Sequence, residues 1–507
     1  MRLFALLHIP FLALFAYSLH GTGFCCDDFE VAMGRARDPW FNFLLANPAN
    51  ILTHGLPFLW FDYEQQYVYD LLKFGWVALS YGMTYRWGSL FFPPARAALF
   101  AALFIFYPAH DSTSFWFTAQ YLMLTAAFYL FAFYLAAGDR LVAATAMATL
   151  ASFVSYGSSP WAFGLSLAFL LQRQFRRAAA LLVPNLIYIA YYAAITLWLG
   201  RGNPRLPVQL DAERLLKQLV IQIAGGTDAV LGVSLWFKLW YSVASLTLVS
   251  AVVGAVIVLL LLRIRFHDGA PARVNRPVWL GVAAVALAGC GMLALTPGYP
   301  QAAFGLSNRI TIYASFPAAF LLAYLAKRAW SANALAALLV FSSLGTSDHW
   351  RAWRGVQDRT IEALRNDAEL ASGTLGTGTI FVVGHHYSRL GPIVHISFLG
   401  QKGVDNAVFE LALGARKTFR TAPLTSRFVV EPGALVDLRD GQRYPVAGPV
   451  LVYDAQAHRL QRIDLEDMPG FIASLEIPKR HWIQVVEIVW VRELILRWMP
   501  QLGYLWR

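Results

Sequence analysis

The fold is decided by the stretch Gly23-Phe24-Cys25-Cys26-Asp27-Asp28-Phe29-Glu30, which directly follows the apolar run 3–19. Three carboxylates stand within four residues, at the point where a membrane helix would emerge into water. A carboxylate at that depth is costly to desolvate, so it is usually solvated, paired or functional. We therefore predict that the remaining chain is a scaffold that holds this acidic loop on one side of a membrane.

The composition is typical of a membrane protein. Of the 507 residues, 58% are hydrophobic and only 14% are charged, whereas soluble domains are about 25% charged. The mean hydropathy is +0.50. The formal net charge of +11 fits basic cytoplasmic loops and lipid head groups. Nucleic acid is not an expected partner, because no basic cluster with interleaved aromatic residues stands in a polar segment.

Apolar runs recur at lengths near the ~20 residues that a bilayer requires. We predict about eleven transmembrane helices. The first is the run 3–19, read as an uncleaved span in preference to a cleaved signal peptide. The others are expected at 67–84, 95–107, 115–137, 141–156, 161–171, 178–199, 236–262, 278–295, 310–326 and 332–344.

Charge sets the predicted orientation. With a cytoplasmic N-terminus, the short basic connections fall on the inner side, as the positive-inside rule requires. The outer loops then contain Asp27-Asp28, His110-Asp111 and the segments 201–234 and 297–309. We predict a multi-pass inner-membrane protein whose transmembrane domain covers 1–346 and has a long first outer loop at 21–65.

The C-terminal part changes character. A polar helical pattern at 348–367 precedes three strand candidates at 379–383, 427–430 and 449–453, with Gly and Pro turns between them. We expect a small extracytoplasmic α/β domain at 347–480. The tail 481–507 is expected to be an amphipathic interfacial helix, because its charged residues would otherwise enter the bilayer.

Cysteine and histidine predict neither a disulfide framework nor a metal site. Cys25 and Cys26 are adjacent, and adjacent cysteines rarely bridge each other, so we expect small buried side chains. Cys290 lies in an apolar run, and neither CxxC nor HExxH occurs. His385-His386 follows an apolar run without a third ligand nearby. The use of a divalent metal is left open.

The outer loops collect residues suited to glycosyl transfer. That reaction needs a carboxylate that takes a proton or supports an oxocarbenium-like centre, and cations that hold a leaving phosphate. Each candidate also has a purely structural explanation. The aspartates could cap helices, His54 could be a packed side chain, and Arg309 could extend its charge to the membrane interface. The catalytic candidates are Asp27, Asp28 and Asp111; the substrate-binding candidates are Glu30, His54, His110, Arg201, Arg205, Asn308 and Arg309.

A first span followed by an outer loop that opens with Asp-Asp resembles the GT-C superfamily of multi-spanning glycosyltransferases, over most of the chain. The resemblance implies a polyprenyl-phosphate-linked sugar donor and a cell-envelope glycan, lipid or protein acceptor. It implies the catalytic acid at Asp27 or Asp28, a second acid at Asp111 and a lipid-phosphate ligand at Arg309. No Trp-Trp-Asp motif occurs, which argues against protein N-glycosylation.

Three other functions remain alternatives. An envelope-polysaccharide polymerase or ligase would use a large outer loop, for which 201–234 is the candidate. A lipid or solute transporter would carry charges within its spans, and Lys73 and Lys238 stand near span ends. A non-catalytic assembly protein would need no acidic site. Replacing Asp27 and Asp28 by Asn separates the last alternative from catalysis.

Overall fold

A computed structural model describes residues 2–34, 44–198, 211–263, 274–295, 300–373, 375–376, 378–475 and 489–498. The chain divides into two compact units. The first comprises Met1–Gly23, Asp38–Trp350 and Trp482–Arg507, and the second comprises Phe24–Arg37 and Arg351–His481. The sequence predicts a domain at 347–480 and assigns the segment Phe24–Arg37 to the transmembrane part, whereas this segment groups with the second unit.

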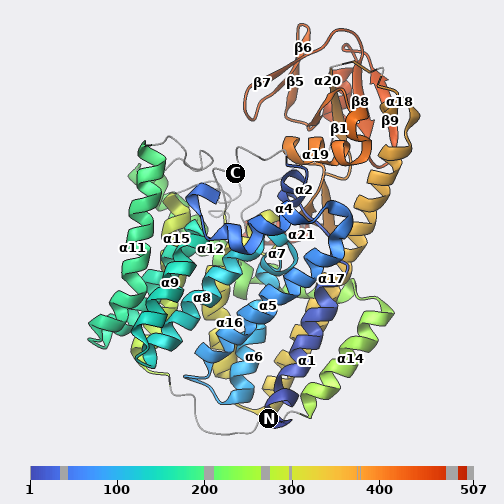
Figure 1. The fold of residues 1–507 in the computed structure, drawn as a ribbon. Coiled ribbons are helices and arrows are strands. Elements are labelled where there is room, and N and C mark those ends of the chain that lie inside the picture. Colours follow the sequence, from blue (N-terminus) through green and yellow to red (C-terminus); the bar gives the residue numbers. More distant parts are fainter. Residues whose placement is uncertain are drawn as a thin grey trace. The chain divides into compact units, whose positions relative to one another are not determined.

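The described residues of the first unit are helical (Figure 1). Short helices and turns, among them α4 (Leu56–Trp60) and α7 (Ser112–Phe115), connect the longer ones. The longer helices are α1 (Arg2–Leu19), α5 (Gln66–Gly88), α6 (Pro94–Ile105), α8 (Gln120–Ala137), α9 (Leu141–Val154), α10 (Ser159–Leu171), α11 (Phe175–Trp198), α12 (Ala212–Leu231), α13 (Val233–Ala244), α14 (Leu248–Leu262), α15 (Arg276–Leu295), α16 (Ile312–Leu325), α17 (Ala329–Asn366) and α21 (Val489–Trp498).

Fewer helices qualify as membrane spans than the predicted eleven. Within the described ranges, four helices are long and apolar enough to cross a membrane, and a fifth candidate is the pair α12 and α13, bent by 40°. The expected spans at 95–107 and 161–171 form helices of only 12 and 13 residues. At 1.5 Å per residue they reach about 20 Å, which is short of the ~30 Å hydrocarbon core.

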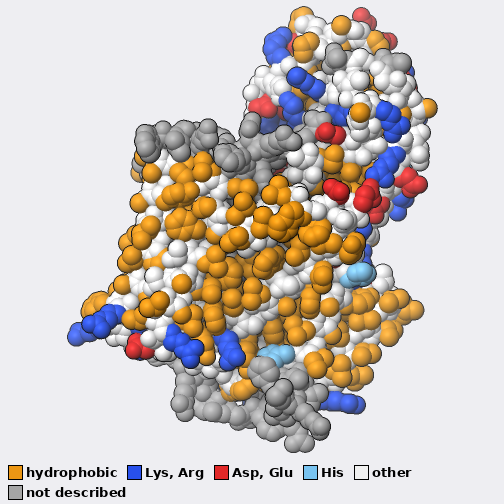
Figure 2. All heavy atoms as spheres, in the orientation of Figure 1, with side chains coloured by type: hydrophobic (Ala, Val, Ile, Leu, Met, Phe, Trp, Pro, Cys, Tyr) orange, Lys and Arg blue, Asp and Glu red, His pale blue; other side chains and the backbone are white. Residues whose placement is uncertain are grey.

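The surface of the first unit is unusually apolar. Val142, Leu197 and Leu248 are each more than four-fifths exposed, at 88%, 85% and 81%. Figure 2 shows hydrophobic side chains covering most of the visible face of the helical unit. A soluble monomer rarely exposes a contiguous patch of this kind, whereas a lipid-facing surface requires one.

Small residues allow the helices to approach closely. A Cβ added at Gly164 of α10 would lie 2.5 Å from the backbone nitrogen of Val285 in α15, and one added at Gly281 of α15 would lie 2.9 Å from the Cβ of Ala168. Such close backbone approach is typical of helix pairs in membranes, where van der Waals packing replaces the hydrophobic effect.

The second unit is an α/β fold. Its main sheet has the strand order β4-β1-β8-β9, with β1 parallel to both β4 and β8, and β9 antiparallel to β8. A β2–β3 hairpin and a β5-β6-β7 sheet complete it. The strands are β1 (Thr379–Val383), β2 (Tyr387–Leu390), β3 (Ile393–Ser397), β4 (Arg420–Pro423), β5 (Phe428–Glu431), β6 (Ala434–Asp437), β7 (Gln442–Pro445), β8 (Val450–Asp454) and β9 (Arg459–Ile463); the helices include α18 (Ala368–Ala371), α19 (Lys402–Leu413) and α20 (Met468–Ser474).

The acidic residues Asp27, Asp28 and Glu30 are part of this second unit. Helix α2 (Asp27–Ala32) packs on α19, and the ring of Phe29 lies 5.5 Å from that of Phe398. Cys25 and Cys26 are joined by a disulfide, so the expectation that they do not bridge was wrong. The left-handed φ of 55° at Cys26 turns the chain between them, and their sulfur atoms lie against the carbonyl of Ser397.

Asp405 is a buried acid in the first turn of α19. It is fully buried, and neither carboxylate oxygen has a hydrogen-bond partner among the described residues. Burial therefore raises the pKa of Asp405 well above its usual value, although the backbone of Gln401 partly offsets the rise. Because the folded-state pKa is the higher one, the contribution of Asp405 to stability is fully present below the unfolded-state pKa of about 3.9 and is lost as pH rises toward the folded-state value.

We expect Asp405→Asn to stabilise the second unit at pH 8 by about 1–3 kcal/mol, because it removes a buried charge without a partner. Hydrogen exchange of the α19 amides in the full chain measures the effect. The gain should shrink as pH falls toward 4. The matched control is Glu466→Gln on the exposed surface, which should change protection little at either pH. Equal protection of wild type and Asp405→Asn at pH 8 would contradict the prediction.

Candidate functional site

A buried carboxylate organises the centre of the first unit. Asp111 follows the short turn Pro108–His110 and precedes α7. Pro108 ends the preceding helical segment, because the residue before a proline disfavours helical backbone. The Asp111 side chain is 4% exposed. The free-energy cost of burying this carboxylate must therefore be offset by hydrogen-bond donors from elsewhere in the unit.

Three elements distant in sequence supply those donors. Lys238 Nζ donates to Asp111 Oδ1 over 2.7 Å, and Asn308 Nδ2 donates to the same oxygen over 2.5 Å. Trp350 Nε1 donates to Asp111 Oδ2 over 3.0 Å. Both carboxylate oxygens are thus held, which suits a fixed negative charge better than a base that must accept a proton.

Lys238 lies on α13, directly after the bend in the α12–α13 pair. Gly232 forms the break in an extended conformation, and the carboxylate of Asp228 accepts the backbone N–H of Ser234 at the start of α13. Lys238 itself is fully buried and also donates to the carbonyl of Ala303 over 2.6 Å. A lysine in this setting acts as an internal cation opposite Asp111.

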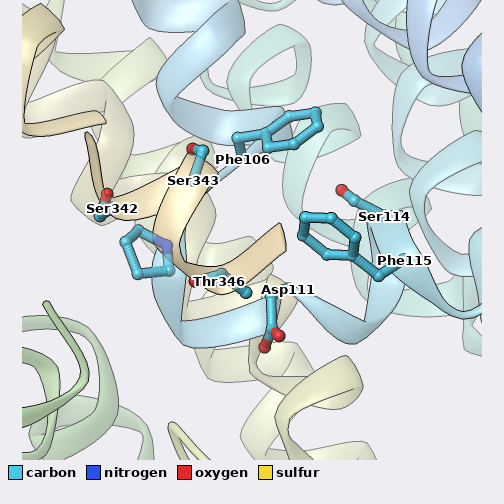
Figure 3. A pocket seen from close by; sticks show the side chains of 8 residues that line it. Phe106, Asp111, Ser114, Phe115, Ser342, Ser343 and Thr346 are labelled. Carbon is cyan, nitrogen blue, oxygen red and sulfur yellow. The ribbon is translucent and has the colours of Figure 1, made fainter. Parts of the chain in front are cut away.

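A small cavity adjoins Asp111. Its volume of about 10 Å³ is close to the space that one water molecule needs. Figure 3 shows Asp111 beside Thr346 and Phe115, with Ser342, Ser343 and Ser114 farther around the lining. The lining contains the hydroxyl groups of Ser114, Ser342, Ser343 and Thr346.

His110 fixes the turn before Asp111. It is fully buried, and its Nε2 donates to the carbonyl of Phe104 over 2.8 Å, while Nδ1 lies 2.8 Å from Thr113 Oγ1. Burial lowers the pKa of His110 to about 3, so the ring is neutral near pH 7. These contacts fix the orientation of the ring within the turn. That His110 binds substrate stays a prediction.

Asn308 and Arg309 connect this centre to an aromatic cluster. Both belong to the 3-10 segment Leu306–Thr311. The Arg309 guanidinium lies 4.8 Å from the ring of Trp116 and donates to the carbonyl of Leu306. Trp116 is 4% exposed, and its indole N–H has no hydrogen-bond partner among the described residues. A cation and an unused donor therefore lie together beside the buried carboxylate site.

The other predicted site residues do not group with Asp111. Asp27, Asp28 and Glu30 belong to the second unit. Asp27 is half-buried, whereas Asp28 is fully buried and accepts the backbone N–H of Cys25 over 3.1 Å. A Cβ added at Gly403 would lie 2.5 Å from the Glu30 carboxylate oxygens. Glu30 thus lies at the first turn of α19, where a negative charge is favourable.

The remaining candidates lie away from the acid. His54 is buried with its Nδ1 2.8 Å from Thr53 Oγ1 and its ring 5.0 Å from that of Phe117. Burial lowers the pKa of His54 to about 3, which is typical of a packed neutral side chain. Arg201 and Arg205 lie outside the described residues.

A second buried ion pair was not predicted. Asp70 and Lys73 pair over 3.0 Å on α5. Lys73 also donates to Thr22 Oγ1 and to the carbonyl of Gly23, and Asp70 accepts the backbone N–H of Gly21. The pair holds the chain where α1 ends. Its signal in the sequence is the i, i+3 spacing of opposite charges within an apolar run.

Among the described residues, no group of three or more His, Cys, Asp or Glu side chains is arranged to hold a metal ion. No family model, no curated protein and no solved structure matches the chain.

Proposed function

We propose that this protein is an integral membrane glycosyltransferase that moves a sugar from a polyprenyl-phosphate donor to a cell-envelope glycan, lipid or protein acceptor. We place the reaction on the extracytoplasmic side and the N-terminus in the cytoplasm, following the positive-inside pattern of the loops. The acidic loop and multi-helix scaffold resemble the GT-C superfamily.

The observation that carries the proposal is the short segment in which Asn308 binds a buried carboxylate and Arg309 lies over an aromatic ring. Asn308 donates to Asp111, and the next residue places a guanidinium 4.8 Å from Trp116. An arginine beside a donor indole suits the phosphate and hydroxyl oxygens of a sugar phosphate. The neighbouring Asp111–Lys238 pair fixes the electrostatic field around it.

Asp27 and Asp28 differ in burial, and this difference supports separate roles in the proposed reaction. Asp27 is half-buried, so its carboxylate can meet a hydroxyl. Asp28 is fully buried and holds the Cys25 N–H. We assign Asp27 as the candidate general base and Asp28 as a positioning residue of α2.

We expect Asp27→Asn to lower sugar transfer by about 100-fold or more, the usual contribution of a positioned base. Transfer from a labelled polyprenyl-phosphate sugar to envelope acceptors in membranes measures it. Asp28→Asn should retain more activity and mainly reduce the amount of folded protein. The control Asp139→Asn changes an acid that is 78% exposed and should leave transfer unchanged.

Normal transfer in the Asp27→Asn, Asp28→Asn double variant, with normal insertion, would end the catalytic assignment of this loop. A proton-coupled transporter is the second candidate. It is favoured by the two buried ion pairs, Asp111–Lys238 and Asp70–Lys73, because ionisable residues inside a membrane unit often mark proton relays. Solute uptake driven by a pH gradient, without sugar transfer, would favour that candidate.

A further inference from the structure

The main sheet of the second unit has a topological switch point between β1 and β8. From β1 the chain passes through the β2–β3 hairpin and α19 to β4 on one side, whereas β8 continues into β9 on the other side. The two strands are parallel, and Val383 pairs with Asp454, so their carboxyl ends are level (Figure 1). In open α/β sheets, ligands bind outside the carboxyl ends of strands at such a point.

The two loops that leave this point carry histidines in left-handed backbone conformations. The φ angles are 76° at Gly384, 47° at His385 and 51° at His458. A Cβ added at Gly384 would lie 2.9 Å from Gln456 Cγ, so glycine permits the two loops to approach. The rings of His385 and His458 are 6.5 Å apart. Non-glycine residues in this conformation carry strain, which concentrates at binding and active sites.

The part of helix α17 from Arg351 onward belongs to the second unit and adds hydrogen-bond donors. The Trp353 ring lies edge-on to His385, with 5.8 Å between centroids. Trp353 is 9% exposed and Gln357 2% exposed, and neither Trp353 Nε1 nor Gln357 Nε2 has a partner among the described residues. They are one turn apart and so face the same way. The missing acceptor of each donor would be supplied by a ligand oxygen or by a water molecule.

The charges that act on His385 are mostly positive. Burial is the largest cause of the lowered pKa of His385; the neighbouring His458, Arg359 and His386 lower it further, and the carboxylate of Asp454 raises it. That carboxylate already accepts two backbone N–H groups, those of Gln456 and Ala457, over 2.9 and 3.0 Å.

His386 is a structural neighbour of this group. Its Nε2 donates to the carbonyl of Val382 over 3.1 Å, and burial lowers its pKa, so it stays neutral near pH 7.

We propose that the switch point between β1 and β8 is a binding site for a tetrahedral oxyanion such as a phosphate group, held by His385 and His458. A cation does not suit this set, because donors outnumber acceptors, and no three-ligand metal group occurs among the described residues. The site belongs to the second unit alone, so it does not depend on the proposed transfer reaction.

Binding at this site is linked to protonation. Burial, followed by the charge of His458, lowers the pKa of His385, so without a ligand the ring is mostly neutral near pH 7. An anion beside His385 raises the pKa of that ring, so that binding takes up protons. Affinity for an anion should therefore increase as pH falls from 8 to 6.

The test uses the full chain in nanodiscs of zwitterionic lipid and isothermal titration calorimetry. Inorganic phosphate is the probe for affinity, and sulfate is the probe for the pH profile, because its charge does not change between pH 6 and 8. We expect phosphate to bind, and sulfate to bind more tightly at pH 6 than at pH 8. Proton uptake appears as a dependence of the binding heat on the buffer.

His385→Asn and His458→Asn are the diagnostic variants, because asparagine tolerates left-handed backbone and so preserves the loops. Each should weaken phosphate binding by about tenfold or more, the value of one hydrogen bond to a charged group. Arg439→Gln, an exposed arginine in the β6–β7 turn, is the matched control and should bind phosphate as wild type does.

A further arm identifies the source of the phosphate group. If the natural ligand is a lipid head group, nanodiscs that contain phosphatidate compete with inorganic phosphate. If the natural ligand is a soluble molecule, they do not compete. Both results support an oxyanion site. The proposal is overturned if both Asn variants bind phosphate as wild type does, if no phosphate binds at pH 6, or if Zn²⁺ binds through these histidines while phosphate does not.

Discussion

Lys238→Met is expected to destabilise the first unit by about 3–5 kcal/mol, the usual result of removing one partner from a buried ion pair. Lys238 is fully buried and compensates the charge of Asp111, which is 4% exposed. Methionine keeps the apolar stem but supplies no cation. Thermal unfolding in detergent, followed by maleimide labelling of the buried Cys290, measures the loss.

The double variant Lys238→Met, Asp111→Asn tests the cause. It removes both charges, so most of the lost stability should return. Lys217→Met changes an exposed lysine on α12 and serves as the control. A melting temperature for Lys238→Met equal to that of the control would show that the pair does not support the fold. A stable double variant without activity would assign the pair to function as well.

Gly345→Ala is expected to have a comparable effect through packing. Gly345 lies on α17, and a Cβ added there would overlap the backbone carbonyl oxygen of Ser242 on α13. A backbone atom cannot move aside as a flexible side chain can, so the helices must separate. We expect a loss of about 3 kcal/mol or more, at the upper end of the range for overpacking.

Separation of α13 and α17 should also disturb the hydrogen bonds of Asp111. Lys238 on α13 and Trp350 on α17 both donate to Asp111, and Gly345 lies where those two helices meet. The yield of monodisperse protein and the labelling temperature of Cys290 report the damage. Gly75→Ala and Gly82→Ala on α5 are controls with open space around the added Cβ, and should be neutral or stabilising by up to about 1 kcal/mol. A Gly345→Ala melting temperature equal to those of the controls would refute the packing argument.

Hydrophobic pattern predicted the helical scaffold and the strand-rich C-terminal part, because both depend on local composition. It did not predict how many helices are long enough to span. The runs 95–107 and 161–171 are apolar, but α6 and α10 end after 12 and 13 residues, and composition alone does not set the length of a helix that is covered by its neighbours. Arg96 on α6, for example, is only 7% exposed.

Part of the candidate site was also visible in the sequence. Asp111 and Asn308 were singled out, and the structure brings them together. The sequence analysis named Lys238 only as a charge near a span end. It predicted neither Lys238 nor Trp350 as a partner of Asp111, because the pairs join residues more than 100 positions apart. No local spacing encodes such a pairing. A lysine inside the apolar helix 233–244 was the one available signal, since a buried lysine needs a counter-charge.

The first loop shows a different limit. Charge alternation assigned Asp27 and Asp28 to a loop of the transmembrane domain, whereas the structure places them in the second unit. Apolar packing places the segment in the second unit, because Phe24 and Phe29 are both 1% exposed and α2 packs on α19. The sequence shows that these side chains need burial but does not show which surface provides it.

The discontinuous build of the second unit has a consequence for biosynthesis. Its first segment, Phe24–Arg37, leaves the ribosome about 310 residues before Arg351, where the rest of the unit begins. At about 5–20 residues per second, this delay lasts roughly 15–60 s. During that interval α2 has no α19 to pack on, and its aromatic side chains need another cover. The packing of α2 on α19 therefore has to wait until the chain beyond Arg351 has been synthesised, long after the first segment of the unit.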